Sequence, residues 1–134
     1  IESVVIGMAH RGRLNVLVNV CEKPMHQLFT QFNPVPLEGL GSGDVKYHLG
    51  TLSERTLERS GKLLRIAMLG NPSHLEAVAP SVVGRVRAKQ VAQKDPKGEK
   101  SLAILVHGDA AFAGQGICYE TMHLTNLPDY TTGG

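Results

Sequence analysis

The run SLAILVH at residues 101–107, followed by Gly108, is the clearest β-strand signal in the sequence. Its five consecutive apolar residues, in a run that ends at a glycine, predict a strand. Two similar runs precede it, SVVIGM at 3–8 and LRIAMLG at 64–70. Between these runs, apolar residues recur at the three- and four-residue spacing of helices. Strands that alternate with helices predict an α/β fold in which a parallel sheet is flanked by helices.

The expected helices follow from three- and four-residue spacing of apolar side chains. This spacing runs from Leu14 to Phe32, where Pro24 divides the stretch into two helices. Residues 33–43 hold two prolines and three glycines, which predicts a long loop. Two further helices are predicted, one over 81–93 with Pro80 at its start and one over 115–126.

The composition excludes several classes of protein. A chain of 134 residues with 42% apolar and 19% charged residues can bury a core, so collagen-like, disordered and disulfide-dense classes are excluded. The net charge of +2 gives no indication of nucleic-acid binding, and no apolar run reaches the roughly 18–20 residues of a membrane span. Cys21 and Cys118 suit a reducing compartment, are expected in the core, and show no zinc-site spacing with the histidines. The ends, Ile1 and Gly133-Gly134, lead us to expect a segment of a longer protein.

Polar motifs follow each predicted strand, at the end where ligands gather in parallel sheets. After the strand at 101–107, Asp109 is placed to hold a divalent cation such as Mg²⁺ if a diphosphate supplies other oxygens. The alternative is that Asp109 only caps the next helix. After the strand at 64–70, Asn71-Pro72 predicts a helix start. The motif NPSHLE at 71–76 is either a ligand-binding turn or a capping turn.

Two further motifs contain cationic side chains or histidine. HRGR at 10–13 is either an anion clamp or, as we favour from the residues alone, a solvated basic turn. The glycine-bounded stretch at 41–50 contains His48, which is a candidate ligand for an anionic substrate or an ordinary loop histidine.

Four motifs together resemble the E1 component of 2-oxoglutarate dehydrogenase. They are GMAHRGRLNVL at 7–17, GDVKYHLG at 43–50, NPSHLE at 71–76 and HGDAAFAGQG at 107–116. The resemblance runs in order along essentially the whole chain. It implies that residues 1–134 are one fragment of a thiamine-diphosphate-binding fold, without a second domain.

The resemblance also implies roles for individual residues. Asp109 would ligate Mg²⁺ and, through it, the diphosphate of thiamine diphosphate. Two histidines, His10 and His48, would bind the carboxylates of 2-oxoglutarate and so serve catalysis. The remaining cofactor contacts would come from Arg11, Ser73, Leu75, Ala110 and Ala111.

The implied activity is the oxidative decarboxylation of 2-oxoglutarate in the tricarboxylic acid cycle, with succinyl transfer to a lipoyl group of E2. The implied parent is a homodimer in the mitochondrial matrix, or in the cytoplasm if bacterial. In the family, a second Mg²⁺ ligand and a catalytic Glu lie beyond Gly134, so the fragment alone is expected to be inactive. The alternatives are a 2-oxoadipate dehydrogenase E1, a non-catalytic α/β fragment, and a sugar-phosphate or nucleotide hydrolase that uses Asp109 and His74.

Overall fold

The computed structural model describes residues 1–32 and 48–132 and has a four-stranded sheet at its centre. The strands are β1 (Ser3–Met8), β2 (Thr51–Thr56), β3 (Leu63–Met68) and β4 (Ser101–Val106), in the order β2-β3-β1-β4. β1 pairs in parallel with both β3 and β4, whereas β2 pairs with β3 in antiparallel fashion. The predicted α/β fold is confirmed, and the three predicted strands are correct to within two residues.

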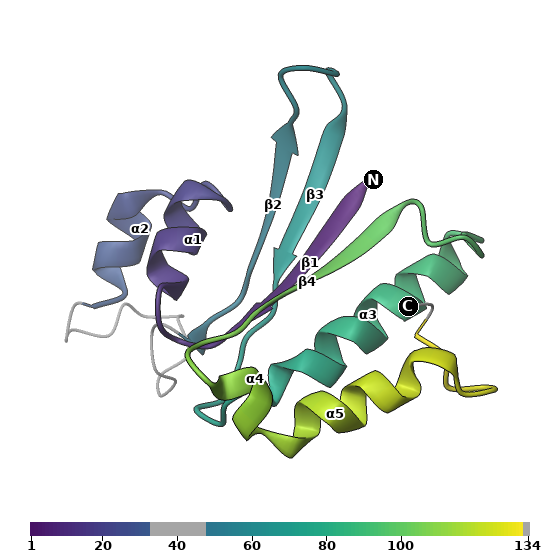
Figure 1. Cartoon of the computed structure of the whole chain (residues 1–134). Coiled ribbons are helices and arrows are strands. Elements are labelled where there is room, and N and C mark those ends of the chain that lie inside the picture. Colours follow the sequence, from purple (N-terminus) through teal and green to yellow (C-terminus); the bar gives the residue numbers. More distant parts are fainter. Residues whose placement is uncertain (33–47, 133–134) are drawn as a thin grey trace.

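Helices cover both faces of this sheet (Figure 1). α1 (Arg13–Asn19) and α2 (Met25–Thr30) lie toward one face, and α3 (Val78–Ala92) packs against β1 and β4 on the other. α4 (Ala111–Gly114), α5 (Gly116–His123) and the 3-10 turn η2 (Leu124–Asn126) follow β4, and α5 contacts α3. Within residues 1–32 and 48–132, no helix has the length and apolar character that crossing a bilayer requires.

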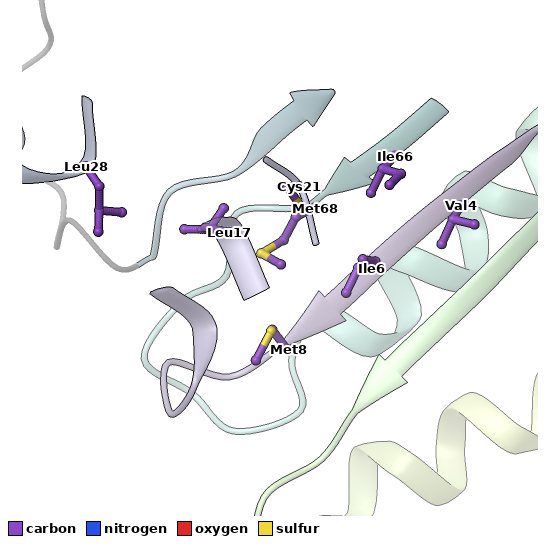
Figure 2. Packing of buried hydrophobic residues seen from close by; sticks show 8 residues of the cluster. All are labelled: Val4, Ile6, Met8, Leu17, Cys21, Leu28, Ile66 and Met68. Carbon is purple, nitrogen blue, oxygen red and sulfur yellow. The ribbon is translucent and has the colours of Figure 1, made fainter. Parts of the chain in front are cut away.

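The core consists of two clusters because alternate residues of β1 point to opposite faces. Val4, Ile6 and Met8 face α1 together with other apolar side chains, as Figure 2 shows. Val5 packs on the opposite face with residues of α3 such as Val82. Burial on both faces explains why β1 has no polar alternation. The predicted core positions of the two cysteines are confirmed, since both are buried and neither forms a disulfide.

Gly7 lets α3 approach β1 closely. A Cβ atom at this position would lie 2.6 Å from Val82 Cγ2 and 3.2 Å from Leu105 Cδ2. We therefore expect Gly7→Ala to destabilise the fold by about 1–3 kcal/mol through overpacking, measured as a lower melting temperature. Gly84→Ala is the matched control, because no atom lies within 4 Å of its added Cβ. A Gly7→Ala protein as stable as the Gly84→Ala protein would contradict this packing argument.

The antiparallel edge strand β2 was not predicted from the sequence. Its residues TLSERT are mostly exposed, and Leu52 is 75% exposed, so no apolar face marks it as a strand. It pairs with β3 through a tight turn in which the Leu57 amide bonds to the Lys62 carbonyl and Gly61 has φ +64°. The sheet is therefore mixed, with an antiparallel strand beside three parallel ones.

The start of α3 also differs from the prediction. Asn71-Pro72 does not begin a helix; the helix begins at Val78, and the residues between form an irregular loop. Pro80 is the third residue of α3, a position where its missing N–H removes no hydrogen bond because the first helical N–H groups have no intrahelical partner. Pro80 is therefore compatible with a helix that begins three residues before Ser81.

Candidate functional site

The predicted motifs gather at one edge of the sheet. The carboxyl ends of the parallel strands β1, β3 and β4 share this edge, and they lead into residues 10–13, 71–76 and 107–111. Because β2 is antiparallel, its amino end and the preceding His48 lie at the same edge. Figure 1 shows these chain segments converging near α1 and α4. This convergence is the condition for a ligand site built from several loops.

Arg13 is buried, so both sequence interpretations of it are wrong: it is neither a solvated basic residue nor an exposed anion clamp. Its guanidinium donates to the Met8 carbonyl at 3.0 Å, to the Leu49 carbonyl at 2.8 Å and to the Leu69 carbonyl at 2.5 Å. Burial lowers the pKa of Arg13. One side chain thus ties together the end of β1, the segment before β2 and the end of β3.

His10 and His48 lie close together, as their shared implied role requires. Their ring centroids are 6.3 Å apart and the rings are tilted by 48°. His10 is exposed beside a hollow of about 210 Å³, whereas His48 is buried. The His48 carbonyl accepts the Asn71 amide at 3.1 Å, which fixes it against the end of β3. Of the predicted loop at 33–43 and the stretch 41–50, residues 33–47 lie outside the described ranges.

The chain makes a close backbone approach at Gly50, two residues after His48. A Cβ atom on Gly50 would lie 2.6 Å from the Met68 carbonyl oxygen and 2.9 Å from the Gly70 nitrogen. Backbone atoms cannot move aside as a flexible side chain can. A residue without a Cβ is therefore needed where the chain passes from His48 into β2.

The loop after β3 presents Ser73 and Leu75 outward, and both are exposed. Asn71 is buried at its base, where its Nδ2 donates to the Pro72 carbonyl at 3.0 Å. The Asn71 Oδ1 atom is buried and has no hydrogen-bond partner within the described residues. Buried acceptors are rarely left unpaired, so this oxygen is a candidate contact for a water molecule or a bound group.

The loop after β4 presents Asp109 and Ala110 to solvent, while Ala111 is buried and begins α4. The N-cap of α4 is Ala110, in the left-handed region at φ 53°, and no side chain caps the helix. The alternative that Asp109 serves as a helix cap is therefore wrong. Within residues 1–32 and 48–132, the Asp109 carboxylate has no hydrogen bond or ion pair, so both oxygens are open to a hard cation.

The structure connects some of the predicted residues and leaves others apart. Arg11 is exposed after β1, and no side-chain contact in the described part of the chain links Asp109 to Arg11, Ser73 or His74. The hydrolase that would pair Asp109 with His74 gains no support from this arrangement.

Two residues that the sequence reasoning did not select join the loops after β3 and β4. His107 Nδ1 and Glu76 Oε2 lie 2.5 Å apart across 31 residues of sequence. Glu76 ends the motif NPSHLE and His107 begins the motif HGDAAFAGQG, but nothing in their spacing indicates that they meet. Cys118 lies beside them, where the ligand atoms of all three residues fall within 4.8 Å of one another.

Sequence comparison identifies the family to which this edge of the sheet belongs. The profile of the dehydrogenase E1 component family matches residues 2–132. The chain belongs to this E1 family. The match covers every element of the fold and each of the three strand-end motifs, so the resemblance predicted from the motifs is confirmed.

Individual relatives of this E1 chain are similar along its whole length. It is 55% identical over 136 residues to the mitochondrial 2-oxoglutarate dehydrogenase-like protein of Pongo abelii. It is 54% identical over 138 residues to the mitochondrial 2-oxoglutarate dehydrogenase of Dictyostelium discoideum, and 54% identical over 134 residues to that of Caenorhabditis elegans. Each alignment covers 100% of this chain, which spans only 13% or 14% of the length of these relatives.

Proposed function

We propose that this E1 chain forms the diphosphate- and metal-binding part of a 2-oxoglutarate dehydrogenase. The observation that carries the proposal is the gathering of three strand-end loops at one sheet edge, in a chain 54–55% identical to proteins of that name. The cofactor we propose is thiamine diphosphate with Mg²⁺. Its bound form supplies the electron sink that decarboxylation of a 2-oxo acid needs.

The residues present fit this group. Asp109 offers an exposed carboxylate with no partner in the described part of the chain, which is the hard oxygen ligand that Mg²⁺ takes. Arg11 places a guanidinium at the same edge, where it would bind an anionic phosphate oxygen. The cofactor surface would be completed by Ser73, Leu75, Ala110 and Ala111.

His10 and His48 would orient the substrate. Their 6.3 Å ring separation at the end of β1 suits the binding of a dicarboxylic 2-oxo acid by imidazole N–H donors. The His48 side chain is buried and its backbone carbonyl accepts from the Asn71 amide, so it would hold the substrate with little loss of side-chain freedom. His10 is exposed, so it would contact the substrate where the substrate enters the site.

The partners and location are proposed on the same basis. The product fragment, a succinyl group, would pass to a lipoyl-bearing E2 succinyltransferase, and the full-length parent would be a homodimer. Because the relatives named above are mitochondrial proteins, the mitochondrial matrix is the proposed location.

The test is the substrate preference of the full-length parent. We expect CO₂ release from 2-oxoglutarate that requires both thiamine diphosphate and Mg²⁺. We also expect kcat/KM for 2-oxoglutarate to exceed that for 2-oxoadipate by about 10- to 200-fold, the usual discrimination for one methylene. The isolated residues 1–134 are the control and should release no CO₂.

Each other outcome points to a different conclusion. A preference for 2-oxoadipate would support the 2-oxoadipate dehydrogenase E1 alternative. Decarboxylation by residues 1–134 alone would contradict the idea that this chain is only part of a catalytic site. A parent without thiamine-diphosphate-dependent activity would overturn the proposal.

A further inference from the structure

The hydrogen bond between Glu76 and His107 joins two loops of the proposed cofactor site. Glu76 ends the loop that follows β3 and is buried, with 5% of its side chain exposed, whereas 23% of the His107 side chain is exposed. The two atoms, Glu76 Oε2 and His107 Nδ1, are 2.5 Å apart. Glu76 reaches this position with φ at 66°, in the left-handed region that a non-glycine residue occupies only where its surroundings hold it there.

The His107 ring is held on a second side by an aromatic contact. Phe112 of α4 packs edge-on against it, with ring centroids 5.0 Å apart and an interplanar angle of 83°. Phe112 in turn lies 6.1 Å from the Tyr119 ring of α5. Asp109, Ala110 and Ala111 are thus bracketed in sequence by two side chains, His107 and Phe112, that contact each other. Fixing His107 therefore limits the positions that Asp109 can take.

A metal ion shared by Glu76, His107 and Cys118 is the other interpretation of this cluster, since their ligand atoms lie within 4.8 Å of one another. Ligands at the usual 2.0–2.2 Å from a tetrahedral zinc stand about 3.3 Å apart, well beyond the 2.5 Å between Glu76 and His107. Burial and the nearby Glu76 charge both raise the pKa of the Cys118 thiol, which disfavours the thiolate that a metal binds. The geometry is that of a hydrogen-bonded pair.

We infer that Glu76 and His107 are positioning residues that lock the loop carrying Asp109 to the loop carrying Ser73 and Leu75. This inference rests on the proposed function, because it assigns these two loops to one cofactor. It adds a role that neither residue had from the sequence: Glu76 acts on the loop that carries Asp109 through His107. The carboxylate of Glu76 is the member of the pair that sets the direction of the His107 ring.

The experiment uses the full-length parent in three forms: wild type, Glu76→Ala and Glu76→Gln. Calorimetry gives the Kd of Mg²⁺ at saturating thiamine diphosphate and the Kd of thiamine diphosphate at saturating Mg²⁺. We expect Glu76→Ala to raise the Kd of Mg²⁺ by about 10- to 100-fold, as for other residues that orient a metal ligand. Glu76→Gln keeps a side-chain oxygen to accept from His107 Nδ1, so it should recover most of the affinity. Glu58→Ala, in the exposed turn between β2 and β3, is the matched control and should bind like wild type.

A second pair of measurements separates positioning from general stability. If Glu76→Ala lowers the melting temperature of the cofactor-free protein but leaves both Kd values unchanged, the pair is only structural and the inference is overturned. If Glu76→Ala does not fold, His107→Ala is measured in its place, since it removes the other member of the pair. The inference then requires His107→Ala to raise the Kd of Mg²⁺, and an unchanged Kd would overturn it.

The remaining outcomes are also decisive. One zinc per chain in the purified wild-type protein, lost in Cys118→Ala, would overturn the inference in favour of a metal site. Wild-type parent that binds neither Mg²⁺ nor thiamine diphosphate would remove the proposed function as well. Wild-type binding with unchanged Kd values in the Glu76 variants would remove only this inference.

Discussion

Replacing Arg13 with methionine is expected to cost about 3 kcal/mol of local stability at the strand-end site. Methionine fills much of the volume but donates no hydrogen bond, so the carbonyls of Met8, Leu49 and Leu69 lose their buried partner. An unsatisfied buried carbonyl costs about 1–3 kcal/mol, and the Met8 carbonyl is buried whereas the other two are partly buried. Relief from burying a charge offsets part of the summed loss, so the expected net cost is well below three times the largest single cost.

Hydrogen exchange of the full-length parent measures this loss where it occurs. The Asn71 amide bonds to the His48 carbonyl next to the Arg13 contact, so its protection should fall by roughly 100-fold or more. In Arg13→Lys, the protection of the Asn71 amide should lie between that in Arg13→Met and that in wild type. The reason is that a single ammonium cannot reach all three carbonyls in the geometry of the guanidinium fork. Amides of α5 should keep their protection in both variants.

Arg59→Met is the matched control for this experiment. Arg59 lies in the exposed turn between β2 and β3, and it makes no side-chain contact in the described part of the chain. Unchanged protection of the Asn71 amide in Arg13→Met would mean that the three carbonyls find other partners. The view of Arg13 as the link between three chain segments would then be wrong.

Arg13 also shows why the sequence predicts the fold better than the details of the site. β1 is buried on both faces, whereas β4 has one exposed face, yet both carry continuous apolar runs that are visible in the sequence. Arginine is seldom buried, so the pattern HRGR suggests a basic surface. The three carbonyls that bury Arg13 belong to segments up to 56 residues away, and no local pattern reveals them.

The same reasoning explains the missed strand and the missed pair. β2 is an exposed edge strand held by backbone hydrogen bonds to β3, which any sequence can form, so its polar residues give no signal. Glu76 and His107 meet because two parallel strands, β3 and β4, end at the same edge on either side of β1. The rule that strand ends gather ligands predicts the neighbourhood correctly, but which side chains touch depends on the loops.

Removing the Asp109 carboxylate is expected to have the largest effect on cofactor binding. In the full-length parent, Asp109→Ala should weaken the Mg²⁺-dependent binding of thiamine diphosphate by at least about 100-fold. Loss of a residue that only orients a metal ligand already costs 10- to 100-fold, and Asp109 is the proposed ligand itself. Asp109→Asn keeps one side-chain oxygen but not the charge, so its affinity for thiamine diphosphate should lie between that of Asp109→Ala and that of wild type.

The stability of the cofactor-free protein should scarcely change in the same variants. Asp109 is exposed, caps no helix and has no partner in residues 1–32 and 48–132, so its removal should alter the free energy of unfolding by no more than about 0.5 kcal/mol. Calorimetry for the Kd and thermal unfolding without cofactor measure the two quantities separately. Glu99→Ala, at the opposite end of β4, is the charge-matched control.

This split between binding and stability distinguishes a ligand from a structural carboxylate. A structural Asp109 would lower the melting temperature and leave the Kd unchanged, which is the reverse of the expected result. Equal affinity in Asp109→Ala and wild type would show that the metal is held by other residues. The position of Asp109 argues against both outcomes: its exposed carboxylate has no partner in residues 1–32 and 48–132 and follows the strand whose end His107 and Glu76 fix in place, so it is open to a cation.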